Sequence, residues 1–486
     1  MTVQTFKNLP LRKIVLGLSF SLILSANASV FSDLNTLAYR GDRDAQYDLA
    51  TMYMEGKGVE KDAIKAFEWY QKAAKQGDVD AQFIVGVLYA EGEGVQKNYA
   101  KAMEWYLKAA NQGDSDAQFN IGSMYSEGQG VQKNYAKAME WYQKAAKQND
   151  SDAQFNIGVM YAEGEGVQKN YAKAIEWYQK AADQDHVLAQ NNLALMYFHG
   201  QGTAQNYTKA AQWFQKAANE GNADALNNLG SMYDKGLGVR QDYFKGAEMY
   251  EKAALQGYDV AQNNLGYSYH KGHGVRQNYA KAIEWYQKAA DQGNSNAQNN
   301  LGTMYSQGEY LPQISTKAFE WFQKAANQKH KEAQSNLGWL YYTGDGVEKN
   351  YTKAIELFKK SASQGSDLGQ NNLGLAYHEG NGVEQDYKEA FKLFKKAADQ
   401  GLARAQHNLA TLHYKGLGTK QDYAEAIKLY QKAADQKDGA ALNNLAIMYD
   451  KGLGVKENTI KAIELYGKAC DVGNQTGCDN YRKAKQ

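Results

Sequence analysis

The chain has 486 residues, 43% of them hydrophobic and 22% charged, with a formal net charge of +1 at pH 7. This balance provides no electrostatic attraction for nucleic acid or for an anionic membrane surface, so neither is expected as a partner. A domain built around one core seldom reaches this length, whereas a chain that grows by repetition can. One elongated domain is the economical interpretation.

Residues 1–28 have the layout of a secretory signal peptide. Three basic residues precede an apolar run over residues 14–24, and Ala-Asn-Ala at 26–28 supplies a cleavage site. The apolar run is too short to span a bilayer, and no cysteine follows it that could carry a lipid anchor. We expect cleavage after Ala28 and export to the periplasm or beyond the cell, without membrane insertion. An uncleaved leader that anchors the chain is the weaker alternative.

Residues 29–44 predict a short helix that covers the start of the repeats. Asp33 can cap it, Leu34 and Leu37 are apolar, and Gly41 closes it. From Ala45 onward a 36-residue unit recurs twelve times over residues 45–476, without insertion or deletion. A unit of this size buries its apolar face only against its neighbours, so the period predicts an all-α solenoid.

Each unit predicts two antiparallel helices, here called helix A and helix B. Counting Ala45 as position 1, apolar residues at positions 1, 5, 8 and 9 form one face of helix A, and glycine at position 12 ends it. Asn or Asp at position 18 caps helix B, whose broad apolar face predicts cover from two sides. Glycine or alanine at position 6 allows a close helix crossing. Seven of the eight tryptophans fall at position 25 and are interpreted as core.

The unit at residues 153–188, AQFNIGVMYAEGEGVQKNYAKAIEWYQKAADQDHVL, resembles the Sel1-like repeat, a relative of the tetratricopeptide repeats. The resemblance covers residues 45–476. It implies a right-handed α–α superhelix in which helices A line a concave surface, and it implies an adaptor or scaffold for other proteins or peptides. It implies no shared chemistry, so function is sought at the variable positions.

The C-terminal segment KACDVGNQTGC holds the only two cysteines, Cys470 and Cys478. It is similar to a cysteine-rich, secreted branch of the same family, in which such pairs join one repeat to the next, and this implies a disulfide. Two cysteines without a nearby histidine make a poor metal site. Residues 477–486 predict a second capping helix.

The eighth repeat departs from the pattern in its loop. Tyr310 stands where the other copies have glycine, Pro312 follows, and Ile314 replaces the Asn or Asp cap. The repeat length is kept, so the helix pair should survive. The loop is interpreted as drift, with a contact site or a bend as the alternative. After this repeat, position 25 carries Leu in place of Trp, which hints at two blocks.

No catalytic constellation is evident, and no cofactor or metal is expected. Ser268 and Lys271 form an isolated Ser-x-x-Lys without its usual companion motifs, and it falls at a normally buried position. The histidines lack metal-ligand spacing, and the Gly-x-Gly turns have neither a preceding strand nor a following Lys-Ser/Thr. A β-lactamase-like or cell-wall enzyme therefore remains only an alternative.

The candidate site is the face made by positions 3, 7 and 10 of helix A. Position 3 is aromatic in the first four copies, and a run of large apolar residues on an exposed face suggests a partner site. Position 4 is Asn in ten of twelve copies, either as a binding ladder or as a structural one. Trp339 at position 7 also departs from the packing pattern. The candidate binding residues are Tyr47, Phe83, Phe119, Phe155, Asn120, Asn156, Asn192 and Trp339.

We therefore expect an exported bacterial solenoid, monomeric and without enzymatic activity, that recruits other proteins or peptides. A secreted factor that acts on a host cell is a second alternative.

Overall fold

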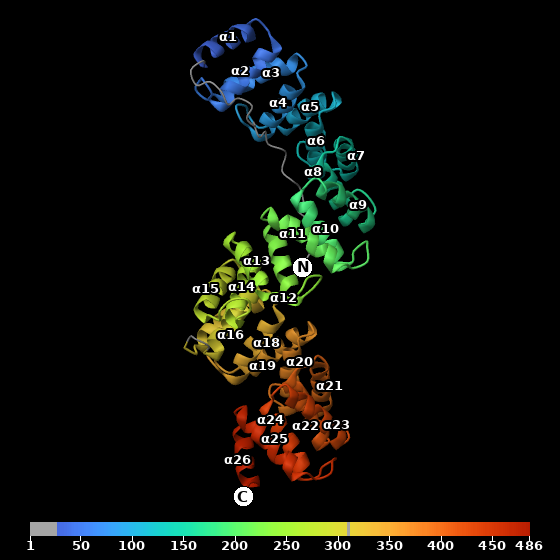
Figure 1. The fold of residues 1–486 in the computed structure, drawn as a ribbon, viewed down its shortest axis with the longest axis vertical. Helices are drawn as coiled ribbons and strands as arrows, with labels where there is room; N and C mark the ends of the chain where they lie inside the picture. Colours follow the sequence, from blue (N-terminus) through green and yellow to red (C-terminus); the bar gives the residue numbers. More distant parts are fainter. Residues whose placement is uncertain (1–26, 309–311) are drawn as a thin grey trace. The chain divides into compact units, whose positions relative to one another are not determined.

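The computed structural model describes residues 27–308 and 312–486 and divides into two compact units, 1–256 and 257–486. Within the described residues there are 26 α-helices and no strand. The leader predicted over residues 1–28 lies outside the described residues except for Asn27 and Ala28, which are part of the first helix. In each unit, helix pairs follow one another in chain order (Figure 1), which confirms the predicted solenoid of helix pairs.

Helices A carry even numbers from α2 to α24, and helices B carry odd numbers from α3 to α25. The first unit contains α1 (Asn27–Tyr39), α2 (Arg43–Glu55), α3 (Ala63–Lys75), α4 (Val79–Glu91), α5 (Tyr99–Asn111), α6 (Ser115–Glu127), α7 (Tyr135–Lys147), α8 (Ser151–Glu163), α9 (Tyr171–Ala182), α10 (Val187–His199), α11 (Tyr207–Asn219), α12 (Ala223–Lys235) and α13 (Tyr243–Leu255). The second unit contains α14 (Asp259–Lys271), α15 (Tyr279–Asp291), α16 (Ser295–Gln307), α17 (Ser315–Asn327), α18 (Lys331–Thr343), α19 (Tyr351–Ser363), α20 (Asp367–Glu379), α21 (Tyr387–Asp399), α22 (Ala403–Lys415), α23 (Tyr423–Asp435), α24 (Gly439–Asp450), α25 (Thr459–Asp471) and α26 (Gln475–Ala484).

The helix boundaries follow from side-chain caps. Asn170 at position 18 accepts a hydrogen bond from the amide of Lys173 at 3.0 Å, as predicted for helix B. Helix A begins two residues before position 1, because the residue at position 34 of the preceding repeat caps it. Asp150 is such a cap and accepts from the amide of Ala153 at 2.8 Å.

Two glycines of the fourth repeat show what the small residues of the unit do. Gly164 ends α8 with φ +79°, in the left-handed region. A Cβ on Gly158, at position 6, would lie 2.6 Å from the ring of Tyr178. The tyrosine ring of helix B therefore packs directly against the backbone of its own helix A, which confirms the predicted close crossing.

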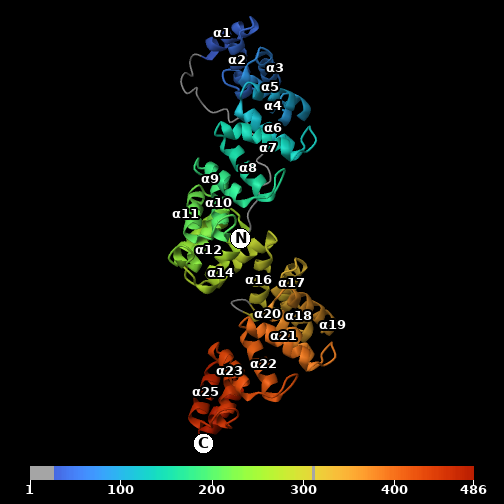
Figure 2. The same ribbon diagram turned by 90° about the vertical axis from the view of Figure 1, so that its right-hand side faces the viewer.

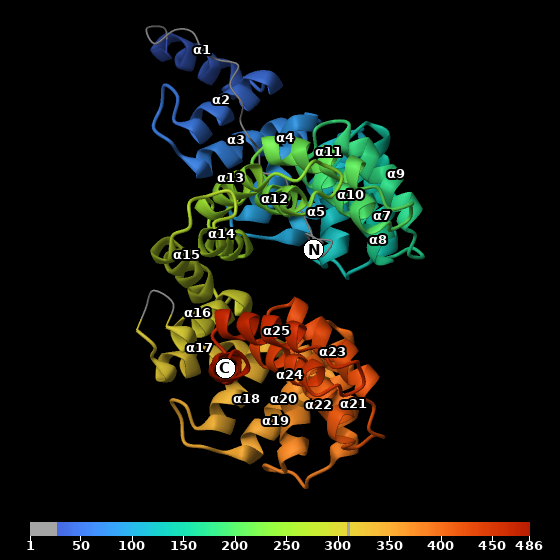
Figure 3. The same cartoon turned by 60° about the horizontal axis from the view of Figure 1, so that its bottom comes forward.

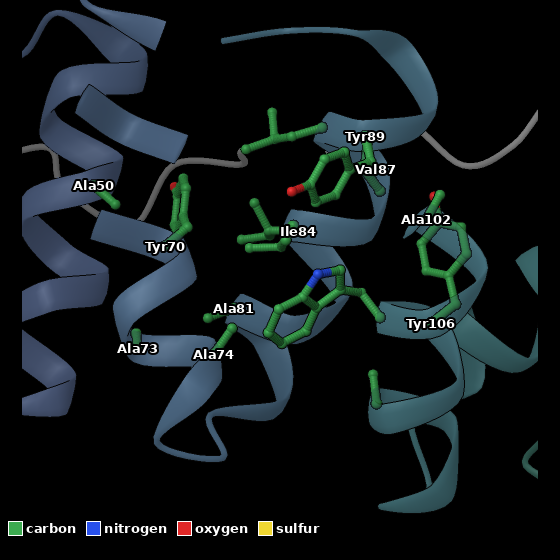
Figure 4. Close-up of a cluster of buried hydrophobic side chains, with 14 of the residues drawn as sticks. Ala50, Tyr70, Ala73, Ala74, Ala81, Ile84, Val87, Tyr89, Ala102 and Tyr106 are labelled. Carbon is green, nitrogen blue, oxygen red and sulfur yellow. The ribbon is translucent and has the colours of Figure 1, made fainter. Parts of the chain in front are cut away.

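The core is a continuous row of small and aromatic side chains between neighbouring helices. Tyr70 is fully buried and packs with Ala50 of the same repeat, while Ala73 and Ala74 pack with Ala81 of the next (Figure 4). Each helix B contacts its own helix A and the helix A that follows it within the same unit (Figures 2 and 3). The predicted two-sided cover of helix B is confirmed.

Glutamines at positions 2 and 32 clamp adjacent repeats together. Gln148 Nε2 donates to Gln118 Oε1 at 3.0 Å and to the carbonyl of Gly113, in the preceding repeat, at 2.7 Å. Gln118 Nε2 in turn donates to the carbonyl of Ala110 at 3.3 Å. Where both glutamines are present, these bonds satisfy buried amides and backbone carbonyls, so they fix the register between repeats.

The eighth repeat keeps its helix pair despite its divergent loop. Both α16 and α17 form, although Ile314 makes no side-chain cap bond. Tyr310 lies outside the described residues. The division between the two units falls after Gln256, two repeats earlier than the change in sequence pattern.

Cys470 and Cys478 form a disulfide that joins α25 to α26, which confirms the implied pairing. We expect a Cys470→Ser/Cys478→Ser variant to lose on the order of 2 kcal/mol of stability, because the short loop closed by the bond constrains the unfolded chain. The loss should be local, since a solenoid end frays without unfolding the array. Hydrogen exchange should quicken in α25 and α26 alone. Equal exchange in the variant and the parent would contradict this.

Candidate functional site: the helix-A face

The helix-A face is made by positions 3, 4, 7 and 10 of the even-numbered helices. In the first unit it is closed. Phe119 and Phe155 are fully buried, and their rings lie 5.6 Å and 5.7 Å from those of Tyr142 and Tyr178. Phe155 also stacks on His186 at 4.7 Å. The expectation that these rings form an exposed stripe is wrong, because each one packs over the helix B tyrosine of its own repeat.

The two earlier aromatic residues at position 3 are less enclosed. Tyr47 and Phe83 are half-buried, and their rings lie 5.4 Å and 5.8 Å from the helix B tyrosines Tyr70 and Tyr106. They make the same intrarepeat contact as the buried pair. The aromatic run in repeats 1–4 is therefore mainly a packing feature.

The predicted amides of the first unit are buried as well. Asn120, Asn156 and Asn192 are at most 5% exposed. Asn156 interacts with the hydroxyl of Tyr142, a residue of the preceding repeat. Burial raises the pKa of that hydroxyl to about 12, so it stays protonated in the working pH range. These amides are not available to an external ligand in this structure.

In the second unit the same positions form an accessible ladder of side-chain hydrogen bonds. An amide at position 4 donates to the position 3 side chain of the preceding repeat, 37 residues earlier. Most of these residues are half-buried. The bonds are Asn300 to Asn263 (3.0 Å), Asn336 to Asn299 (3.1 Å), Asn372 to Ser335 (3.1 Å), Asn408 to Asn371 (3.0 Å), Asn444 to His407 (3.0 Å) and Asn480 to Asn443 (2.8 Å).

Aromatic side chains flank this ladder at position 7. Tyr267 is 45% exposed, and Trp339 is half-buried and stacks on Tyr342 with centroids 5.6 Å apart. The Tyr342 hydroxyl donates to Glu379 Oε2 at 2.6 Å, and Asn381 donates to that hydroxyl at 3.0 Å. The Trp339 ring therefore stacks on a tyrosine whose hydroxyl is held by two hydrogen bonds.

The isolated Ser-x-x-Lys serine is not presented on the surface. Ser268 is 1% exposed and donates to the carbonyl of Asn264 at 3.1 Å, so its hydroxyl is not offered to a substrate. Among the described residues, no group of three or more His, Cys, Asp or Glu side chains could hold a metal ion. No helix in the described ranges has the length and apolar character needed to cross a bilayer.

The Sel1 repeat profile matches the chain twelve times, over residues 43–78, 79–114, 115–150, 151–186, 187–222, 223–258, 259–294, 295–330, 331–366, 368–402, 403–438 and 439–474. The chain belongs to the Sel1 repeat family. Comparison with curated protein sequences gives no match.

Two solved Sel1 repeat structures show how far the likeness extends. The protective antigen c5321 of uropathogenic Escherichia coli is 36% identical, with 93% of this chain and 96% of that one covered and a TM-score of 0.77. A Sel1 repeat protein from Oxalobacter formigenes is 29% identical, with 66% of this chain and 91% of that one covered and a TM-score of 0.51. The likeness supports a Sel1 repeat scaffold of the kind that mediates protein interactions.

Three features of the Sel1 repeats were missed from the sequence: the glutamine clamp, the pairing of position 4 with the preceding position 3, and exposed Tyr267. Gln recurs at positions 2 and 32, so the clamp left a visible signal. The change from Phe to Asn at position 3 also indicated that this side chain makes a different contact within the protein in the later repeats. Neither pattern reveals which residues meet, because the contacts join positions 30 and 37 residues apart.

One hydrogen bond of the ladder, from Asn444 to His407, depends on pH. The His407 Nε2 accepts from Asn444, which requires a neutral ring, and burial lowers the pKa of His407, against a smaller opposing effect of Asp438. The pKa of His407 is therefore lower in the folded state than in the unfolded chain, where it is about 6.5. Its contribution to stability is present above pH 6.5 and is lost as the pH falls through the folded-state pKa. A His407→Asn variant keeps an acceptor and should lose less stability between pH 8 and pH 5 in urea unfolding. Parallel losses in both proteins would contradict this.

Proposed function

We propose that this chain is an exported, non-enzymatic scaffold that binds other proteins or peptides along the helix-A face of its second unit. The observation that carries the proposal is the half-buried amide ladder from Asn263 to Asn480, flanked by Tyr267 and Trp339. The proposal takes the chain as a monomer, which its native mass in solution tests.

The side-chain amides of the ladder can form hydrogen bonds with a polypeptide backbone. A side-chain amide offers two N–H donors and an oxygen with two lone pairs, so one ladder bond uses only part of its capacity. Asn300 and Asn336 are half-buried, with one edge facing solvent. An extended peptide presents the same alternation of donors and acceptors. Aromatic side chains such as Tyr267 commonly anchor such contacts.

Export is supported by independent features of the chain. The first 28 residues have a charged, apolar and Ala-x-Ala order. The disulfide between Cys470 and Cys478 is typical of proteins that leave the reducing cytoplasm. The 36% identical relative is described as a protective antigen, which is compatible with a protein that immune molecules can reach.

Site-specific photocrosslinking tests the binding face. A photoreactive phenylalanine analogue at Tyr267 should give crosslinked products in intact bacterial envelope, and mass spectrometry then identifies the partner. The matched control is the analogue at Phe244, which is 76% exposed on α13 of the first unit. Products at Phe244 and none at Tyr267 would overturn the proposed face. Adding Trp339→Ala should reduce the yield at Tyr267 severalfold.

The alternatives are separated by two further measurements. N-terminal sequencing of exported protein should begin at Ser29, and cytoplasmic protein that retains Met1 would refute export. The pure protein should not turn over a chromogenic cephalosporin, whereas turnover would favour the β-lactamase-like alternative. Crosslinked products found in host lysate but not in envelope would favour the host-directed factor.

A further inference from the structure

Tryptophans at position 25 line the outer side of the helices B. Trp177 and Trp213 each pack against the core of the preceding repeat, which for Trp213 includes Ala181 and Ala182 of α9. The lysine one turn later lies over each indole ring. Its ammonium group is 3.5–4.1 Å from the ring centroid at Lys72/Trp69, Lys108/Trp105, Lys144/Trp141, Lys180/Trp177, Lys216/Trp213, Lys288/Trp285 and Lys324/Trp321.

The sixth repeat has the lysine without the ring. Met249 occupies position 25, and Lys252 pairs with Glu248 at 2.7 Å. Lys288 makes the same pair with Glu284 at 2.8 Å while its ammonium group lies 4.1 Å above Trp285. Lys252 therefore makes the same ion pair as Lys288 without an indole beneath it, as Lys360 and Lys468 do in repeats that carry Leu at position 25.

An open cleft of about 680 Å³ lies where that indole would pack. It is lined by Ala218 of α11 and by Leu226, Met249 and Leu255, with Lys252 and Gln215 at its edge. All of these residues belong to the first unit. Ala218 occupies the same repeat position as Ala182, against whose cluster Trp213 packs. The volume falls within the range of ligand pockets in proteins, roughly 300–1,000 Å³.

The floor of the cleft has become apolar at two other positions in the same repeat. Leu226 replaces the Gln that fills position 2 in ten of the twelve repeats, and Leu255 stands at position 31, where the other repeats carry polar residues. Leu255 is 72% exposed. An exposed leucine by itself needs no explanation. Here two apolar substitutions surround the position of the absent indole, next to a lysine that has no ring beneath it. One common explanation would account for all three features.

We propose that this cleft binds a tryptophan side chain of a partner protein, which completes the row of indoles under Lys252. The chain itself shows which group fits, because seven other repeats fill the matching place with an indole. The ring gains apolar contact with Leu226 and Met249 and a cation–π contact with Lys252. The site is separate from the helix-A face and does not depend on the proposed function.

Methyl NMR of the full mature chain, labelled with ¹³C at its methionine methyl groups, tests the proposal. N-acetyl-L-tryptophanamide is the probe. We expect the Met249 methyl resonance to move upfield and to saturate, because an aromatic ring shields a methyl group held over its face. The resonances of buried Met124 and Met160 in α6 and α8 should not move. An unmoved Met249 resonance would overturn the proposal.

Three variants make the test specific. Met249→Trp fills the cleft with the residue that seven other repeats carry, so it should weaken probe binding at least tenfold, measured by titration calorimetry because this variant lacks the Met249 methyl group. Leu226→Gln restores the usual partner of Gln256 and should weaken it severalfold, which keeps the test valid if Met249→Trp does not fold. Lys252→Gln should weaken it about threefold. If N-acetyl-L-leucinamide binds as well as the probe, or if both Met249→Trp and Leu226→Gln bind it unchanged, the cleft is not an indole site.

Discussion

Replacing Gly238 with alanine should destabilise the first unit by roughly 3 kcal/mol, one of the largest effects expected of a single methyl group in this chain. Gly238 has φ +69°, where an L-residue is strained by about 1–2 kcal/mol. A Cβ there would also lie against the carbonyl of Tyr207 and 2.6 Å from the amide nitrogen of Thr208. Because these are backbone atoms of α11, only movement of one repeat against the next can relieve the clash.

Gly221 is the matched control because it shares the strain without the contact. Its φ is +80°, and a Cβ would meet nothing within 4 Å. Other repeats place Asn149, Asp185, Lys329 and Lys437 at this position with positive φ. Gly221→Ala should therefore cost about 1 kcal/mol. The midpoints of urea unfolding measure both losses, and equal losses would mean that crowding between repeats contributes nothing.

These two glycines show what the repeat pattern could predict. The period, the helix pairs and the cap at position 18 follow from residues within one unit, and each is found in the structure. The pattern also identified the turn glycines. It also separates Gly238, whose position is glycine in eleven of twelve repeats, from Gly221, whose position carries Asn, Asp or Lys in four. The physical reason, a contact across a junction between repeats, is visible only in the structure.

The helix-A face was predicted less well for the same reason. Phe119 is fully buried in a cluster that combines Tyr142 of its own repeat with Ala153 and Ile157 of the next. The ladder bond from Asn300 to Asn263 joins residues of different repeats. Position 3 is therefore filled in two ways: a ring over the helix B tyrosine in repeats 1–4, or an acceptor for the next repeat from Asn263 onward.

Replacing Phe119 and Phe155 together with Asn should lower the melting temperature of the first unit by roughly 10 °C. Each substitution empties a fully buried ring site, and loss of such a ring typically costs about 3–5 kcal/mol. Part of this loss is recovered. The new amides can accept from Asn156 and Asn192, 37 residues further on, as Asn263 accepts from Asn300 in the second unit.

The alanine pair isolates that recovery. Phe119→Ala/Phe155→Ala makes the same cavities without an acceptor, so it should be less stable than the asparagine pair by about 1 kcal/mol per ladder bond. Calorimetry of both variants measures the difference, and crosslinking at Tyr267 should persist in each, because the ladder of the second unit is untouched. An unchanged melting temperature in the asparagine pair would mean that the two rings do not stabilise the fold, and it would favour their role as binding residues. If the alanine pair is the more stable of the two, the hydrogen-bonded ladder is not transferable between the two units.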